Sequence, residues 1–469
     1  MNLKSISAFS LGTLGAAAAG IITVPLLTWL VSSEDIGRFN IYQLVIGFGV
    51  LFLSLGLDQT FARYYNEGVD KNRLLIDCYL PGAIIFMVLL IPVALNYAEI
   101  SQFLYGKVNF FYVALTALSV FVMYMLRIVS VILRMDGNGI SYSINQVLPK
   151  GLFCALLLTC FFVFGRSDFY TVLCLSFFSL LVIIPQFLIG VLKYIKKNRG
   201  KKMPAVLTRS LYGFGLPLLL SSVIYWAVTA IGSMMLKSMA GLEQVGLYAV
   251  AINLAGVAVV FQNILSVVWV PIVYKWVSSN EELSRIDSVL NIVLFFVILL
   301  TSLLGVFSSV VDLLLPPEYS AVKYMVVCAV LQPFFYALSE VSGIGVSVVK
   351  KTYLNVVGNF IVLGVCFASA YFFIPLYGAD GAIMSNAIAF FVFMVFRTEF
   401  SARYWRAIPR CRLYVSTFIC MCLAIFCLLI KELYVVVLCW SVACLLSCLV
   451  FRVEVNAIFN YLSRLKRND

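Results

Sequence analysis

Histidine is absent from this sequence, and charged residues are scarce. None of the 469 residues is His, only 12% are charged, 63% are hydrophobic, and the mean hydropathy is +1.04. Without imidazole, the chain lacks the common ligand of zinc sites, the general base of catalytic triads and the usual proton relay near neutral pH. A soluble globule cannot bury this much apolar surface. The composition therefore predicts an all-α, polytopic membrane protein without a metal site.

Catalytic and cofactor signatures are missing as well. No P-loop or other nucleotide-binding fingerprint occurs, which argues against ATP as the direct energy source. The expected exterior loops are short, roughly fifteen residues or fewer, and leave little room for an extracytoplasmic catalytic domain. We therefore expect a protein that is not an enzyme and that has neither catalytic residues nor a cofactor.

The 13 cysteines form no C-x-x-C pair. Cys420 and Cys422 would face different sides of a helix. Because Cys packs readily between helices, their distribution favours packing over redox chemistry or metal binding. Seven of them lie in the last segments, mostly within apolar runs: Cys411, Cys420, Cys422, Cys427, Cys439, Cys444 and Cys448.

Apolar runs of about twenty residues recur along the chain, each long enough to cross a hydrocarbon core of ~30 Å as a helix. The first run starts like a signal peptide, but it continues well past its small residues, which predicts a retained span. We predict about fourteen spans: 8–31, 40–62, 79–98, 110–132, 144–165, 170–192, 211–236, 246–270, 289–315, 322–349, 354–376, 381–402, 413–430 and 433–451.

Basic residues are unevenly divided between alternate loops. The N-terminus, the loops after even-numbered spans and the C-terminal tail hold 25 of the 33 Lys and Arg residues, with Arg397 grouped among them, whereas the other loops hold 6. Arg127 and Lys150 lie within spans. The positive-inside rule then predicts that both termini are cytoplasmic. The formal charge of +12 follows from this topology and indicates no nucleic-acid partner.

Short matches in order indicate an internal repeat. The segment EDIGRF at 34–39 matches EQVGLY at 243–248, Tyr142 matches Tyr353, and Gly165 matches Gly378, at offsets of 209, 211 and 213 residues. Six spans in each half would give both halves the same orientation, as in transporters built from parallel repeats. The expected organisation is an N-terminal lobe at 1–192, a basic cytoplasmic linker at 193–210, a C-terminal lobe at 211–404, two further spans within 405–452, and an amphipathic cytoplasmic tail at 453–469.

Ionisable side chains inside spans cost about 2.5–3.5 kcal/mol to insert and usually face a cavity. Arg127 and Lys150 are such residues, and Arg63 lies just past the end of the second span. These three are the candidates for a substrate cavity, because cations that face water would suit an anionic cargo, phosphate oxygens above all. The alternative is that Arg127 and Lys150 extend to the lipid headgroups.

Two carboxylates are candidates for proton coupling. Glu340 lies deep in the tenth span, is too short to reach the headgroups, and has no cation near it in sequence. Asp58 is the second candidate, although it is also able to pair with Arg63, at a spacing of five that is poor for one helix face. With no histidine, a buried carboxylate is the group best suited to gain and lose a proton near neutral pH.

Several segments resemble the bacterial polysaccharide-transporter family, the O-antigen flippases. Two of them read SLGLDQTFARYYNE at 54–67 and IPLYGADGA at 374–382. Each segment is short, but together they run in family order over most of the chain. The others are PLLTWLVSSEDIGRF at 25–39, GLP at 215–217, VGLY at 245–248, LLPPEYS at 314–320 and KKT at 350–352.

The resemblance implies the two-lobed fold of the multidrug/oligosaccharidyl-lipid/polysaccharide superfamily, with a central cavity that opens alternately to either side. It implies a cargo of oligosaccharide on polyprenyl pyrophosphate, the repeat unit of O-antigen, capsule or exopolysaccharide, carried to the periplasmic leaflet of the bacterial inner membrane. Membrane lipids and polysaccharide-assembly proteins are the implied partners. The chain departs from many relatives at Gly232-Ser233 in the seventh span, where they carry Asp-Arg, and this shifts the expected cavity role to Arg127 and Lys150.

Three other functions remain as alternatives. A multidrug extruder of the same superfamily would be expected to have a more acidic cavity, and a flippase for the peptidoglycan lipid precursor is a neighbour in that superfamily. A membrane glycan polymerase or ligase belongs to a different class and would need a large exterior loop with catalytic residues, which this sequence lacks.

Overall fold

The computed structural model describes residues 3–67, 69–198, 208–279, 284–349, 351 and 353–456. All regular elements in these ranges are helices, which confirms the all-α fold class. Thirteen described helices are long and apolar enough to cross a membrane, and α1 (Leu3–Leu30) adds an apolar stretch over Leu14–Leu30. These elements correspond to the fourteen predicted spans and make the chain a multi-pass membrane protein.

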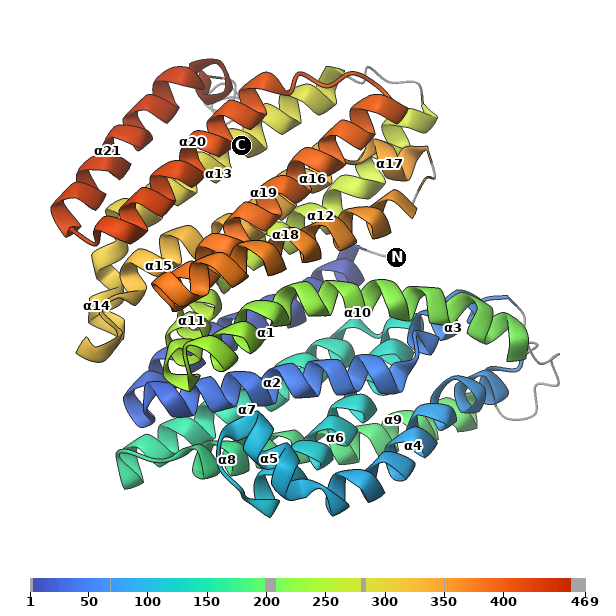
Figure 1. The fold of residues 1–469 in the computed structure, drawn as a ribbon. Coiled ribbons are helices and arrows are strands. Elements are labelled where there is room, and N and C mark those ends of the chain that lie inside the picture. Colours follow the sequence, from blue (N-terminus) through green and yellow to red (C-terminus); the bar gives the residue numbers. More distant parts are fainter. Residues whose placement is uncertain are drawn as a thin grey trace. The chain divides into compact units, whose positions relative to one another are not determined.

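By its internal contacts, the chain divides into two compact units (Figure 1). The first comprises Met1–Met234 and Leu242–Gly246. At its centre, α6 packs against α2, α4, α7, α8 and α9, while α1 lies along α7. Its remaining helices are α2 (Ser33–Ser54), α3 (Leu57–Tyr64), α4 (Lys71–Leu95), α5 (Tyr97–Tyr105), α6 (Phe110–Met135), α7 (Gly139–Phe164), α8 (Phe169–Leu181), α9 (Ile183–Lys197) and most of α10 (Thr208–Met239).

The second unit comprises Met235–Gly241 and Leu247–Asp469. In it, α19 packs against α15, α16, α18 and α20, and α13 packs against α21. Two single 3-10 turns, Ser308–Val310 and Pro317–Tyr319, flank α14. The helices are α11 (Leu242–Leu254, which begins in the first unit), α12 (Gly256–Ser278), α13 (Ser284–Val306), α14 (Val311–Leu314), α15 (Val322–Ala329), α16 (Leu331–Ser342), α17 (Gly345–Val348), α18 (Tyr353–Tyr377), α19 (Ala379–Tyr404), α20 (Cys411–Ile430) and α21 (Leu433–Val450).

Several predicted spans are divided between consecutive helices. The second is divided between α2 and α3 at Leu55-Gly56, and the eighth between α11 and α12 at Ala255-Gly256. The sixth is divided between α8 and α9, and the tenth between α15, α16 and the short α17. A break inside a span frees backbone groups that need polar partners or a cavity, so these breaks mark where polar side chains are to be sought.

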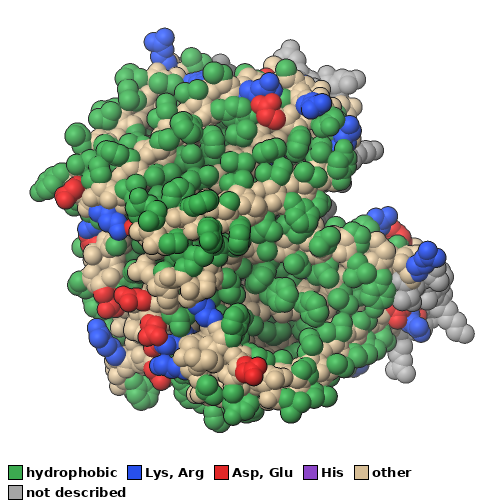
Figure 2. Space-filling model, in the orientation of Figure 1, with side chains coloured by type: hydrophobic (Ala, Val, Ile, Leu, Met, Phe, Trp, Pro, Cys, Tyr) green, Lys and Arg blue, Asp and Glu red, His purple; other side chains and the backbone are tan. Residues whose placement is uncertain are grey.

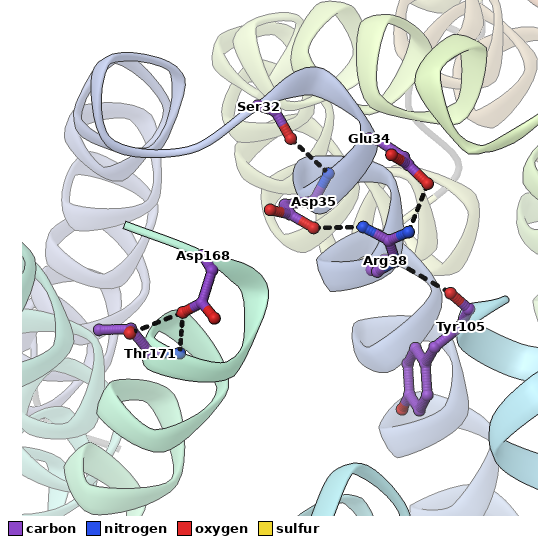
Figure 3. A network of polar contacts seen from close by, with 7 residues as sticks. All are labelled: Ser32, Glu34, Asp35, Arg38, Tyr105, Asp168 and Thr171. Carbon is purple, nitrogen blue, oxygen red and sulfur yellow. Dashed lines mark hydrogen bonds and ion pairs between the residues drawn. The ribbon is translucent and has the colours of Figure 1, made fainter. Parts of the chain in front are cut away.

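The start of α2 is fixed by a cap and by an ion cluster around a buried arginine (Figure 3). The Ser32 hydroxyl accepts a hydrogen bond from the Asp35 amide, which satisfies a free N–H of the first turn. Arg38 is buried, pairs with both Glu34 and Asp35, and donates from Nε to the Tyr105 carbonyl at 2.9 Å. Every charge in this cluster has a partner, so the cluster anchors α5 to α2.

The repeated glycines of the EDIGRF and EQVGLY segments pack reciprocally within the first unit. A Cβ on Gly37 would lie 2.0 Å from the Leu242 carbonyl oxygen, and a Cβ on Gly246 would lie 1.9 Å from the Ser33 carbonyl oxygen. Gly37 therefore faces Leu242, which lies four positions before Gly246, and Gly246 faces Ser33, which lies four positions before Gly37. Because no side chain fits at either position, glycine is required at both.

Hydrophobic side chains cover most of the visible face, and charged side chains gather mainly near the helix ends (Figure 2). This distribution is that of a protein whose solvent is lipid over the middle of its helices. The predicted linker falls partly outside the described residues, at 199–207, as does most of the predicted tail, at 457–469.

Candidate functional site

A sharp corner between α2 and α3 positions the first candidate residue, Asp58. Leu55 and Gly56 both adopt left-handed backbone conformations, with φ of 50° and 69°. A Cβ on Gly56 would lie 2.1 Å from the Gly215 carbonyl oxygen on α10, so only glycine fits at this corner. The corner ends α2 and starts a new helix at Leu57, which places Asp58 in the first turn of α3.

Asp58 forms an ion pair with Arg127 of α6. The guanidinium donates from Nε at 2.8 Å and from Nη2 at 2.5 Å, both to the same carboxylate oxygen, Oδ2. The two partners differ in exposure, because the Arg127 side chain is 45% exposed and the Asp58 side chain only 4%. The exposed partner of this pair is therefore the Arg127 cation, and the buried partner is the Asp58 anion.

This first ion pair lies at a cavity of about 240 Å³ within the first unit. Drug-sized ligands usually occupy about 300–1,000 Å³, so the cavity suits one headgroup better than a whole oligosaccharide. Its walls come from α2, the corner, α6 and α10, and it is lined by Ile46, Gly47, Val50, Leu51, Ser54, Gly56, Asp58, Gln59, Met123, Arg127, Leu219 and Ser222.

Lys150 lies at the same depth as Arg127, on the neighbouring helix. The α6–α7 hairpin is held in register by Ser130, whose hydroxyl accepts hydrogen bonds from Asn145 Nδ2 at 3.0 Å and Gln146 Nε2 at 3.2 Å. Arg127 precedes Ser130 by three residues, and Lys150 follows Gln146 by four, so antiparallel packing brings the two cations level. Lys150 is exposed, does not line the 240 Å³ cavity, and makes no ion pair within the described ranges.

Arg63 is placed differently from the other two predicted cavity cations. It lies on the exposed side of α3, with its guanidinium carbon 4.4 Å from the centre of the Phe214 ring. It does not line the cavity, and Asp58, which the sequence also allowed to pair with Arg63, pairs with Arg127 instead. The alternative Asp58–Arg63 pair, for which the spacing was poor, is therefore not formed, because the corner at Gly56 turns Asp58 toward α6.

Glu340 has a cation partner that the sequence did not suggest. Arg397 of α19 donates from Nη1 to Glu340 Oε1 at 2.5 Å and to the Ser339 hydroxyl at 3.1 Å. The Arg397 and Glu340 side chains are only 9% and 14% exposed. Tyr336 and Phe393 lie within 6 Å of the guanidinium carbon and add cation–π contacts.

Arg397 is the functional candidate that sequence reasoning missed. It was grouped with the loop after the twelfth span, but it lies inside α19 and is buried. A signal was present, because position 397 falls within the predicted span 381–402, where a charge needs a partner. Its Nε has no hydrogen-bond partner among the residues the structure describes.

Hydroxyl groups tie the helices together around this second ion pair. Ser342 and Thr398 share a hydrogen bond of 2.6 Å, and the Ser401 hydroxyl accepts from the Gly345 amide at 3.1 Å. These bonds join α16 and α17 to α19 in the turn that follows Arg397, so the surroundings of the second ion pair are polar but closely packed.

Another hollow, in the second unit, is apolar. A groove of about 520 Å³ runs between α13, α20 and α21. No charged residue lines it, and its lining includes the two serines Ser416 and Ser447. Such a groove suits hydrocarbon rather than a charged headgroup. Nearby cysteines, including Cys420 and Cys439, are free thiols, and no group of three potential metal ligands occurs in the described part of the chain.

Comparison with known proteins gives one family and one fold. A family model described as polysaccharide biosynthesis protein matches residues 2–277. The fold is similar to that of the lipid II flippase MurJ in an inward closed conformation, with 14% identity, a TM-score of 0.67, and coverage of 97% of this chain and 99% of that one. It is also similar to the MATE multidrug transporter DinF-BH, with 14% identity, a TM-score of 0.58, and coverage of 88% and 95%. No curated protein matches the chain in sequence.

Proposed function

This chain belongs to the polysaccharide biosynthesis protein family, and on that premise we propose that it is a flippase for lipid-linked oligosaccharide. The cargo is an oligosaccharide on polyprenyl pyrophosphate, a repeat unit of O-antigen, capsule or exopolysaccharide. By alternating access, the protein moves this lipid from the cytoplasmic to the periplasmic leaflet of the bacterial inner membrane. Its partners are the lipid substrate, the surrounding lipids and polysaccharide-assembly proteins.

The observation that carries this proposal is the exposed cation of the first ion pair. Arg127 stands 45% exposed at a cavity of headgroup size, and Lys150 lies level with it on the adjoining helix. A pyrophosphate presents two linked anionic groups, for which a planar guanidinium and a point-like ammonium are complementary partners. In this proposal, Arg63 on the exposed side of α3 attracts the anionic headgroup as it approaches the cavity.

The membrane potential supplies much of the driving force in this proposal. Moving one charge across 100 mV is worth about 2.3 kcal/mol, and an anion that leaves a cell with a negative interior moves downhill. A pyrophosphate diester with roughly two negative charges gains ~4–5 kcal/mol if its charge crosses the whole field. Glu340 adds a proton-coupling step in our proposal, with Asp58 as the second candidate for that step.

The proposed topology has both termini and the basic segment 193–210 in the cytoplasm. It is tested by labelling single cysteines from outside intact cells, after replacement of the native cysteines. Asn198 is buried and unsuitable, so Lys196→Cys is the cytoplasmic probe and Lys107→Cys the exterior one, both at exposed positions. We expect labelling only at position 107, and labelling only at position 196 would invert the topology.

The function itself is tested in vesicles that contain the purified protein and a radiolabelled oligosaccharide on a polyprenyl pyrophosphate. We expect the wild type to move the label across the bilayer, and the Arg127→Ala, Lys150→Ala double variant to lose this activity at equal protein level. Arg134→Ala, which removes an exposed cation near the end of the same helix α6, is the matched control. Transport of cationic dyes in place of the lipid would support the multidrug alternative, and transport restricted to the peptidoglycan precursor would support the other flippase.

A further inference from the structure

The geometry of the first ion pair leaves one edge of the guanidinium free. Nε and Nη2 of Arg127 both donate to Asp58 Oδ2, whereas Nη1 has no hydrogen bond to any residue that the structure describes. Since Asp58 is 4% exposed and Arg127 is 45% exposed, the carboxylate occupies the buried side of the guanidinium. An incoming anion can therefore approach Arg127 without displacing Asp58.

The local structure places the Asp58 carboxylate at the start of α3, against Arg127. The residue lies in the first turn of α3, where free N–H groups and the helix dipole stabilise a negative charge. Its side chain reaches Arg127 because the corner at Leu55-Gly56 turns α3 away from the axis of α2. No other cation pairs with Asp58 in the described part of the chain.

We propose that Asp58 is a positioning residue and a resident counter-ion for Arg127. This inference rests on the proposed function, since it concerns how the same site binds pyrophosphate, and it takes the place of proton coupling at Asp58, which leaves Glu340 as the coupling candidate. Asp58 directs the free edge of Arg127 toward the cavity and cancels its charge while the site is empty. The empty carrier then returns with a neutral pair, and the pair adds no charge to the loaded carrier.

This arrangement determines how strongly the loaded step and the empty step of the transport cycle each depend on the membrane potential. In the wild type, the Asp58–Arg127 pair adds no charge to either step, so the loaded step carries the roughly two negative charges of the cargo together with the single positive charge of Lys150. If Asp58 loses its charge, Arg127 contributes one positive charge to both steps. Each step then becomes more positive by one charge, and the total per cycle stays the same.

Asp58→Asn tests the proposal because it keeps an acceptor oxygen and removes the charge. The probe is a water-soluble, short-chain polyprenyl pyrophosphate that binds the purified protein. We expect Asp58→Asn to bind this probe about tenfold more tightly, because the charge of Arg127 is no longer cancelled, and to turn over more slowly. Asp58→Glu should bind like the wild type. Asp77→Asn, which removes a carboxylate of α4 that pairs with the exposed Arg73, should have no effect.

A second measurement separates this role from a merely structural one. In exchange across vesicles that hold substrate on both sides of the bilayer, only loaded steps occur, and the negative charge moved in a loaded step should be smaller by about one in Asp58→Asn than in the wild type. An unchanged or weakened affinity together with an unchanged charge per loaded step would overturn the counter-ion role. If Arg127→Ala binds the probe as well as the wild type does, the proposed anion site fails instead, whatever Asp58 does.

Discussion

One member of each intramembrane ion pair occupies a related place in the sequence, but the two pairs differ in exposure. Glu340 follows Arg127 by 213 residues, the same offset as between Gly165 and Gly378. Arg127 is 45% exposed at a cavity, whereas both members of the Glu340–Arg397 pair are at most 14% exposed and are enclosed by aromatic rings and hydroxyls. The two pairs carry the same charges, so the difference in burial distinguishes them. The exposed first pair is accessible to an external ion, whereas the buried second pair links two helices.

The largest expected effect comes from breaking the second ion pair. Arg397→Ala leaves Glu340 as an uncompensated buried charge, and removing one partner of such a pair costs about 3–5 kcal/mol. We expect a large fall in thermal stability in detergent and in the amount of inserted protein. The double change Glu340→Gln, Arg397→Met removes both charges and should restore most of that stability. A single variant as stable as the wild type would contradict the burial of this pair.

Breaking the first ion pair should spare stability and remove function. Arg127 is half exposed, so Arg127→Ala should insert at the wild-type level while transport of the lipid-linked substrate falls by at least about thirtyfold. Transport in vesicles, normalised to the amount of protein, measures this effect. Loss of folded protein in proportion to loss of transport would make the first pair structural, like the second.

Lys150 should tolerate changes of shape better than loss of charge. The residue is exposed and makes no ion pair in the described ranges, so it acts as a point cation beside Arg127. We expect Lys150→Ala to lower transport about tenfold and Lys150→Arg to keep most of it. Equal transport by all three proteins would instead show that Lys150 extends to the headgroups.

The smallest effect is expected from the double change Glu340→Gln, Arg397→Met, which removes the coupling carboxylate without leaving Arg397 as an unpaired buried cation. One pH unit contributes about 1.4 kcal/mol per proton, less than the ~4–5 kcal/mol that the potential supplies to the anion. We therefore expect this variant to transport normally under a membrane potential and to lose only the additional stimulation by an imposed pH gradient. Retention of the full response would assign Glu340 to a structural role with Arg397.

The helices were predictable from sequence, but the ion pairs were not. Apolar runs predicted fourteen spans because each run matches the thickness of a bilayer, and that signal is local. Pairing across 69 residues in Asp58–Arg127 and 57 in Glu340–Arg397 depends on helix packing, which no local pattern encodes. The Leu55-Gly56 corner was hidden for a related reason, because a glycine in an apolar run also fits an unbroken helix.

Photocrosslinking of the substrate tests the central claim most directly. A lipid-linked oligosaccharide with a photoreactive group next to its pyrophosphate would be bound to the protein, irradiated, and mapped by mass spectrometry. The account predicts crosslinks on α6 and α7, within residues 120–150, which disappear in Arg127→Ala and persist in Arg134→Ala. Crosslinks confined to α16 and α19 around Glu340 and Arg397 would contradict it, because the anion would then bind at the buried pair.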